Sequence, residues 1–240
     1  MVILDITGLR AWYNKIEAIH GLDLKFEKGK VTAIIGSNGA GKTTTLKAIS
    51  GLIKRDGRLL YKGKPLPEQS HKIVQEGIVQ VPEGRKVFAG LTAEENLLVG
   101  AYALEDRKEI PELLQQQYEF FPWLEKRKKQ DAGTLSGGEQ QMLAIARGLM
   151  AKPEVLMFDE PSLGLAPLIA NDVFKKIEAI RDQGITVILV EQNARKSLRI
   201  CDYAYVIENG HVVMEGTGDE LIHDERIIHA YLSTAVKEIK

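Results

Sequence analysis

The chain has 240 residues, 44% of them hydrophobic, and a formal net charge of −1 at pH 7. This length can form one large domain, or a domain with an insertion, around a sizeable core. The balanced charge gives no broad positive field, which argues against a nucleic-acid-binding protein. No apolar run approaches the about 18 residues that span a bilayer, and the N-terminus is unlike a signal peptide. Any membrane role is therefore expected to come through partner proteins.

The N-terminal part, about residues 1–30, has the pattern of antiparallel β structure. Four later runs are short, apolar throughout and rich in β-branched residues, which is typical of strands buried on both faces of a parallel sheet. These runs are Val31–Ile35, Ile78–Val81, Val155–Phe158 and Val187–Val190. Helix-like segments separate them, so an α/β fold is predicted.

The first of these strands leads into a glycine-rich phosphate loop. Residues 36–43 match the pattern G-x-x-x-x-G-K-[ST] in full, and a helix-forming run at residues 44–50 follows. Glycines let backbone N–H groups turn toward phosphate oxygens, and the helix adds its positive N-terminal end. Lys42 is predicted to bridge the β- and γ-phosphates of ATP, and Thr43 to ligate Mg²⁺. The residues expected to bind ATP here are Gly36, Ser37, Asn38, Gly39, Ala40, Gly41, Lys42, Thr43 and Thr44.

The middle of the chain, from about residue 92 to 150, reads as a helical insertion. Thr92 and Glu95 have the spacing of a capping box, as do Ser136 and Glu139 ahead of a strong helix pattern. Gly137 and Gly138 fall in the first turn of that second helix, where glycine weakens a helix. Their presence indicates close approach of the backbone to an anion at the helix N-terminus. The alternative is a capping box and nothing more.

Two carboxylates, Asp159 and Glu160, follow the strand Val155–Phe158. Ligands of an open parallel sheet bind at the carboxyl ends of its strands. Asp159 is therefore predicted to hold Mg²⁺, and Glu160 to act as the general base toward the attacking water. An Asp-Glu-Pro turn without catalytic role is the alternative, which the neighbouring phosphate loop disfavours.

The C-terminal part contains the pattern of a hairpin over residues 203–215. Asn209-Gly210 between apolar runs is a strong signal for a two-residue turn. Cys201, the only cysteine, precedes this hairpin and cannot form a disulfide within the chain. We interpret it as a small, partly buried apolar residue rather than a reactive thiol.

The run Leu-Ser-Gly-Gly-Glu-Gln-Gln at residues 135–141, between a phosphate loop and an Asp-Glu-Pro strand end, resembles the ATP-binding-cassette (ABC) ATPases. The resemblance extends from about Leu4 to Leu221. It implies a P-loop NTPase core with a mostly parallel sheet, an N-terminal antiparallel β part and an inserted helical subdomain. The whole of residues 1–240 would form one ABC ATPase domain, with a core at about 1–84 and 152–240 and a helical subdomain at about 85–151.

The resemblance also implies a head-to-tail dimer with two ATP molecules at its interface. Each nucleotide would contact the phosphate loop of one subunit and Ser136, Gly137, Gly138 and Glu139 of the other. Tyr13 stands where the family places an aromatic ring that stacks on adenine, and Trp12 is the competitor for that role.

Three positions depart from the commoner family pattern: Glu83 replaces a Gln, Gln192 replaces a His, and Ala166 replaces an Asp. Glu83 can ligate Mg²⁺ or position water, but it adds negative charge beside the triphosphate. Gln192 can donate a neutral hydrogen bond to the γ-phosphate but carries no positive charge. Ala166 makes no polar contact across a dimer interface.

The segments at residues 81–88, 160–167 and 190–194 together are similar to the ATP-binding subunits of bacterial branched-chain amino acid importers, whose relatives include urea and short-amide importers. The similarity implies two membrane-spanning permease subunits, an extracytoplasmic substrate-binding protein and a second ATP-binding subunit, identical or different. The chain would then sit on the cytoplasmic face of the membrane, held there by the permeases.

Three other classes of protein share parts of this pattern. A small-molecule kinase would leave the Ser136 run unexplained. A GTPase needs an Asn-Lys-x-Asp sequence after the loop, whereas the only Asn-Lys here, at residues 14–15, precedes it. A non-transport ABC protein acting on nucleic acid or ribosomes usually carries two cassettes, long coiled coils or basic arms, none of which is present.

Overall fold

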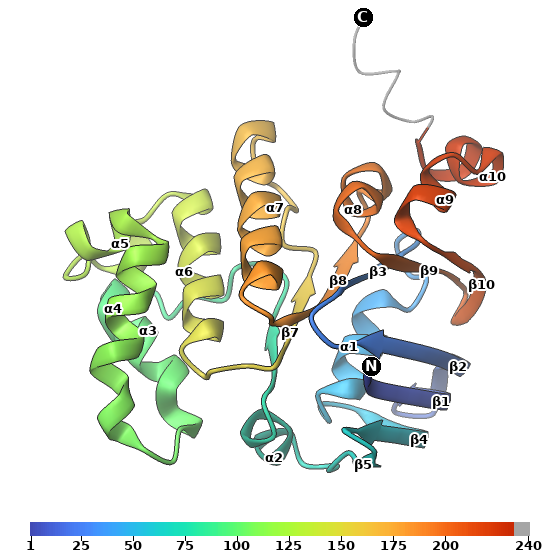
Figure 1. The fold of residues 1–240 in the computed structure, drawn as a ribbon, viewed down its shortest axis with the longest axis horizontal. Coiled ribbons are helices and arrows are strands. Elements are labelled where there is room, and N and C mark those ends of the chain that lie inside the picture. The colour runs from blue at the N-terminus through green and yellow to red at the C-terminus, as the bar shows by residue number, and fades with distance from the viewer. Residues whose placement is uncertain (233–240) are drawn as a thin grey trace, which may run out of the picture.

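The computed structural model describes residues 1–232 and contains two β-sheets with helices around them (Figure 1). The strands are β1 Val2–Tyr13, β2 Ile16–Glu27, β3 Val31–Ile35, β4 Lys54–Tyr61, β5 Lys64–Pro65, β6 Ile78–Val81, β7 Val155–Asp159, β8 Thr186–Glu191, β9 Tyr203–Glu208 and β10 His211–Gly216. The α-helices are α1 Lys42–Ile49, α2 Ser70–Gln75, α3 Ala93–Gly100, α4 Ile110–Phe120, α5 Pro122–Lys126, α6 Gly137–Leu149, α7 Pro167–Asp182, α8 Ala194–Ile200, α9 Gly218–Ile222 and α10 Glu225–Ile227. Short 3₁₀ turns, η1 Ala101–Ala103, η2 Arg107–Glu109 and η3 Ala132–Thr134, and a π-turn, η4 Ile228–Leu232, complete the set.

The larger sheet has the strand order β10-β9-β3-β8-β7-β6, and only β10 runs antiparallel to its neighbour. Every residue of β3, β7 and β8 is buried because helices or the second sheet cover both faces. The four predicted strands are therefore confirmed, and their carboxyl ends meet along one edge.

The smaller sheet is antiparallel, in the order β2-β1-β4-β5, which confirms the prediction for the N-terminal part. Helix α1 lies between the two sheets and contacts β1 and β2 on one side and β7 and β8 on the other. The helix that follows the phosphate loop is thus fixed from both sides.

The hairpin of β9 and β10 turns at Asn209 and Gly210, with φ angles of 48° and 75°. The tip is not free in solvent. The N–H of Gly210 donates to the carbonyl of Ala40 at 2.9 Å, and its carbonyl accepts from the N–H of His20 at 3.1 Å. A Cβ atom at Gly210 would lie 2.5 Å from the Ala18 carbonyl oxygen, so the contact needs glycine.

Helices α3 to α6 gather at one end of the molecule, opposite the antiparallel sheet (Figure 1). Both predicted capping boxes are present, with Thr92 as the N-cap of α3 and Ser136 as the N-cap of α6. Apolar residues of these helices share one hydrophobic core with α7 and with strands β6 to β8. None of the helices within residues 1–232 has the length and apolar character that crossing a membrane requires.

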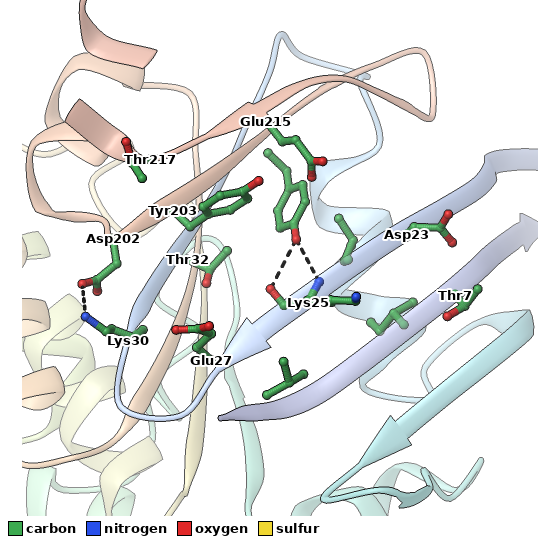
Figure 2. A pocket seen from close by; sticks show the side chains of 14 residues that line it. Thr7, Asp23, Lys25, Glu27, Lys30, Thr32, Asp202, Tyr203, Glu215 and Thr217 are labelled. Carbon is green, nitrogen blue, oxygen red and sulfur yellow. Dashed lines mark hydrogen bonds and ion pairs between the residues drawn. The ribbon is translucent and has the colours of Figure 1, made fainter. Parts of the chain in front are cut away.

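A cavity of about 720 Å³ opens where the two sheets diverge (Figure 2). The Tyr205 hydroxyl joins the sheets there, because it accepts from the N–H of Lys25 at 2.9 Å and donates to the carbonyl of Lys25 at 3.3 Å. The rest of the lining carries charges of both signs, including Lys30 paired with Asp202 at 2.8 Å. The lining residues come from β1, β2, β3, β9, β10 and adjoining loops, so this cavity is separate from the phosphate loop.

Candidate active site

The phosphate loop connects β3 to α1 and takes backbone angles that favour glycine. Gly39 and Gly41 have φ angles of 82° and 112°, in the left-handed region. A Cβ atom at Gly36 would lie 2.3 Å from the carbonyl oxygen of Ile207. The loop therefore has to be glycine-rich, and its last glycine is the N-cap of α1, whose N-terminal end favours an anion.

Lys42 is buried, with 4% of its side chain exposed, and its Nζ has three partners. It donates to the carbonyls of Gly36 at 3.0 Å and Ser37 at 3.1 Å, and lies 3.2 Å from Oε1 of Glu160. An ammonium group has three N–H donors. All three are thus directed at protein acceptors that a bound phosphate would have to replace.

Asp159, at the end of β7, faces the first turn of α1. Its Oδ1 accepts a hydrogen bond of 2.7 Å from the hydroxyl of Thr43. Burial raises the pKa of Asp159 above its ordinary value, opposed by the bond from Thr43 and reinforced by the negative charges of Glu83 and Glu160. A hydroxyl and a carboxylate this close are hard oxygen ligands of the kind that Mg²⁺ prefers. Within residues 1–232 no group of three or more His, Cys, Asp or Glu could hold a metal on its own.

A cavity of about 340 Å³ brings together residues from four separate parts of the chain. It is lined by Asn38, Gly39, Gly41, Lys42, Thr43, Thr44, Glu83, Glu160, Leu163 and Gln192. Glu83 and Gln192, which follow β6 and β8, are exposed and can reach a ligand in it. The phosphate loop and the predicted catalytic residues thus lie at one site, at the carboxyl edge of the parallel sheet.

Glu191, at the same edge, has no role predicted from the sequence. It is 2% exposed and accepts hydrogen bonds from the N–H groups of Ser162 at 2.9 Å and Asn193 at 3.4 Å. Burial raises its pKa, while these hydrogen bonds oppose the rise. Glu191 therefore ties the loop after Glu160 to the loop that carries Gln192. The only sequence signal was a carboxylate at the end of a fully apolar run.

The two aromatic candidates for the adenine contact, Tyr13 and Trp12, have different neighbours. The Thr44 hydroxyl donates to the Tyr13 hydroxyl at 3.5 Å, and Lys47 Nζ lies 5.6 Å from the Tyr13 ring centroid. Trp12 instead lies among the cations Arg10 and Lys54, at 5.9 and 5.6 Å from its ring centroid. Tyr13, whose side chain is partly exposed, therefore contacts the helix of the phosphate loop, whereas the cations near the Trp12 ring come from β1 and β4.

The Ser136 motif lies at the start of α6, and none of its four predicted residues lines the cavity of the phosphate loop. Ser136 accepts from the N–H of Glu139 at 3.3 Å, and Glu139 accepts from the N–H of Ser136 at 2.9 Å. A Cβ atom at Gly137 would lie 2.6 Å from the Arg85 guanidinium, and one at Gly138 would lie 2.6 Å from Ile169. Within one chain, the two glycines make room for these side chains.

Known proteins share both the sequence and the fold. A family model for ABC transporters matches residues 19–163. The BraG high-affinity branched-chain amino acid transport ATP-binding protein of Pseudomonas aeruginosa is 45% identical over 96% of this chain and 99% of its own length. The probable branched-chain amino acid transport ATP-binding protein LivF of Archaeoglobus fulgidus is 39% identical over 93% of this chain and 96% of its own length. The lipopolysaccharide export system ATP-binding protein LptB of Haemophilus influenzae is 30% identical over 99% of this chain and 100% of its own length.

Solved structures agree with these relatives. A nucleotide-free ATP-binding cassette from an ABC transporter has a TM-score of 0.83 and 29% identity, covering 99% of this chain and 98% of that one. An ABC transporter cassette in its ADP conformation has a TM-score of 0.83 and 27% identity, covering 97% of this chain and 99% of that one. This chain therefore belongs to the ABC transporter family and is one of its ATP-hydrolysing cassettes.

Proposed function

We propose that this chain is the ATP-hydrolysing subunit of an ABC importer that takes up branched-chain amino acids or related small amino acids and amides. One observation carries the proposal: Lys42, Thr43 and Glu160 line a single cavity in a chain 45% identical to BraG. Import of urea or another small solute is the alternative within the same subfamily. Lipopolysaccharide export, which the name of LptB states, is a second alternative, supported by an identity of only 30%.

In this proposal each residue of the cavity has a defined task. Lys42 exchanges its protein acceptors for β- and γ-phosphate oxygens, and Tyr13 stacks on adenine. Glu160, released from Lys42, accepts a proton from the attacking water. Gln192 donates a neutral hydrogen bond to the γ-phosphate, and Glu83 positions the water or the metal. Mg²⁺, held by Thr43 and Asp159, would supply charge neutralisation at the phosphates.

The Ser136 motif is assigned to the nucleotide of a second ATP-binding subunit. Ser136 is exposed at the N-terminus of a 13-residue helix, which suits it to contact an anion from outside the chain. ATP would then hold two subunits together, and loss of the γ-phosphate would let them separate. The second subunit is a copy of this chain or a homologous chain.

The helical segment of about 85–151 is proposed as the subdomain that meets two permease subunits. A cavity of about 720 Å³ lies between α2 and the turns after α3, lined in part by His71, Val99 and Tyr102. Tyr102 is 83% exposed and Val99 is 40% exposed, an apolar surface suited to a protein partner. Permease loops docked here would hold the chain at the cytoplasmic face of the membrane, with a substrate-binding protein delivering solute on the other face.

The test is transport by the chain reconstituted with its permeases and binding protein in liposomes. We expect uptake of labelled leucine that requires internal ATP and Mg²⁺, and phosphate release without a phosphorylated acceptor. Lys42→Ala should abolish both. ATP hydrolysis that drives no uptake of any branched-chain amino acid, while another solute is carried, would overturn the substrate class. Phosphorylation of a small molecule would overturn the transport assignment.

A further inference from the structure

Gln80 is a polar residue in the middle of β6, between the buried residues Val79 and Val81. In the register of the sheet it lies opposite Met157 of β7. Alternate residues of a strand face the same side, so Asp159 projects from the same face as Met157, diagonally across from Gln80. This is the face that packs against α1. The strand therefore places an amide beside the carboxylate assigned to the metal.

The two oxygens of Asp159 have different donors. Oδ1 accepts from Thr43 at 2.7 Å, and Oδ2 accepts from Nε2 of Gln80 at 3.5 Å. Asp159 is only 2% exposed, so water cannot readily replace either donor. The bond from Gln80 is long, but a donor at Oδ2 restrains rotation of the carboxylate about its last bond.

Ser50 holds the oxygen end of the Gln80 amide. Its hydroxyl donates to Oε1 of Gln80 at 2.7 Å, which leaves the NH₂ group directed at Asp159. The opposite orientation would place two oxygens against each other at Asp159. Ser50 is the C-cap of α1, and Thr43 lies in the first turn of the same helix. Both ends of the phosphate-loop helix are thus connected to Asp159 through side chains.

From this network we propose that Gln80, oriented by Ser50, is a positioning residue that holds the Asp159 carboxylate in the orientation that receives the divalent cation of ATP. The inference rests on the proposed function. A neutral donor suits the task, because Lys or Arg at this position would pair with Asp159 and compete with the cation. The carboxylates of Glu83 and Glu160 already surround the site, so restraint of Asp159 without loss of its charge preserves the attraction for a cation. Partners that orient a metal ligand commonly contribute about 10-fold or more to metal affinity.

The test compares nucleotide affinity with and without metal in the purified full-length chain. A fluorescent ATP analogue is titrated in EDTA and at a series of Mg²⁺ concentrations, and Mn²⁺ binding to the nucleotide complex is followed by electron paramagnetic resonance. Gln80→Met keeps the side-chain length and removes the donor. We expect its metal-free affinity to remain within about twofold of the wild type, and its apparent metal affinity to fall about tenfold.

Ser50→Ala keeps Gln80 but frees its amide, so a smaller loss of metal affinity in the same direction is expected. Val79→Ala is the matched control in the same strand, since Val79 packs into the opposite core. It should lower thermal stability without changing metal affinity. An unchanged metal affinity in both Gln80→Met and Ser50→Ala would overturn the inference, as would an equal loss of nucleotide affinity in EDTA. A wild type that binds nucleotide without any effect of metal would instead contradict the proposed function.

Discussion

The ion pair between Lys42 and Glu160 predicts that removing the Glu160 carboxylate tightens the binding of ADP. Glu160 Oε1 lies 3.2 Å from Lys42 Nζ, with the two side chains 11% and 4% exposed. A nucleotide has to take Lys42 away from this carboxylate. Glu160→Gln keeps the shape and removes the charge, so the competitor becomes weaker while Gly36 and Ser37 still accept from Lys42.

The magnitude follows from the charge that is lost. The amide oxygen of Gln still accepts from Lys42, so the contact weakens by only part of the about 1.5–3 kcal/mol of a hydrogen bond to a charged group, about 1–1.5 kcal/mol. About 1.4 kcal/mol corresponds to a factor of ten. ADP affinity should therefore rise about 5- to 10-fold in Glu160→Gln. ADP is used because it is not hydrolysed, so a slower reaction cannot produce the apparent gain.

Calorimetric titration of ADP, in Mg²⁺ and in EDTA, measures the effect. Glu83→Gln is the control, because it removes the same charge from the same cavity without touching Lys42. In EDTA it should change ADP affinity no more than about threefold. An unchanged or weaker affinity in Glu160→Gln would refute the reasoning. An equal gain in Glu83→Gln would attribute the effect to overall charge rather than to the contact with Lys42.

Three further predictions follow from local geometry. Ser136→Ala and Thr217→Ala each remove the N-cap of a capping box, and each should lower the free energy of unfolding by about 1 kcal/mol in urea titrations. Only Ser136→Ala should also lower ATPase activity. Equal ATPase activities of the two variants would contradict the role of Ser136 in the second subunit's site. Burial raises the pKa of the Cys201 thiol to about 12, so iodoacetamide at pH 8 should label it far more slowly than free cysteine, and rapid labelling of the folded chain would show a reactive thiol. Burial also raises the pKa of Glu191 above its value in the unfolded chain, so this group makes folding less favourable as pH rises from about 4. The stability of Glu191→Gln relative to the wild type should therefore increase between acid and neutral pH. A stability difference that is the same at every pH would be inconsistent with this cause.

The strands of the parallel sheet could be predicted because their burial on both faces removes polar residues from the sequence. Strand β4 could not be predicted, since its first half, Lys54 to Gly57, is polar and only partly buried at most. It becomes a strand through its pairing with β1, which no local pattern encodes. Helix α2 was missed for a similar reason, because among its residues only Ile73 is buried.

The closeness of Lys42, Thr43 and Asp159 could be predicted, because each belongs to a local motif at the carboxyl end of a strand. The contacts between motifs required the structure. Ser50 and Gln80 are 30 positions apart, and Gln80 and Asp159 are 79 apart, so spacing along the chain says nothing of their network. The same holds for Arg85 against Gly137, where the structure adds a packing reason for a glycine that the sequence explained by an anion alone.

The hydrogen bonds at Gly210 have a practical consequence for engineering. Hairpin tips usually accept inserted peptides, but this one connects the carbonyl of Ala40 in the phosphate loop to the backbone of His20 in the antiparallel sheet. A purification tag or reporter inserted between Asn209 and Gly210 would disturb the phosphate loop through the Gly210–Ala40 hydrogen bond. The hairpin tip therefore supports the phosphate loop, and labels are better inserted elsewhere on the surface.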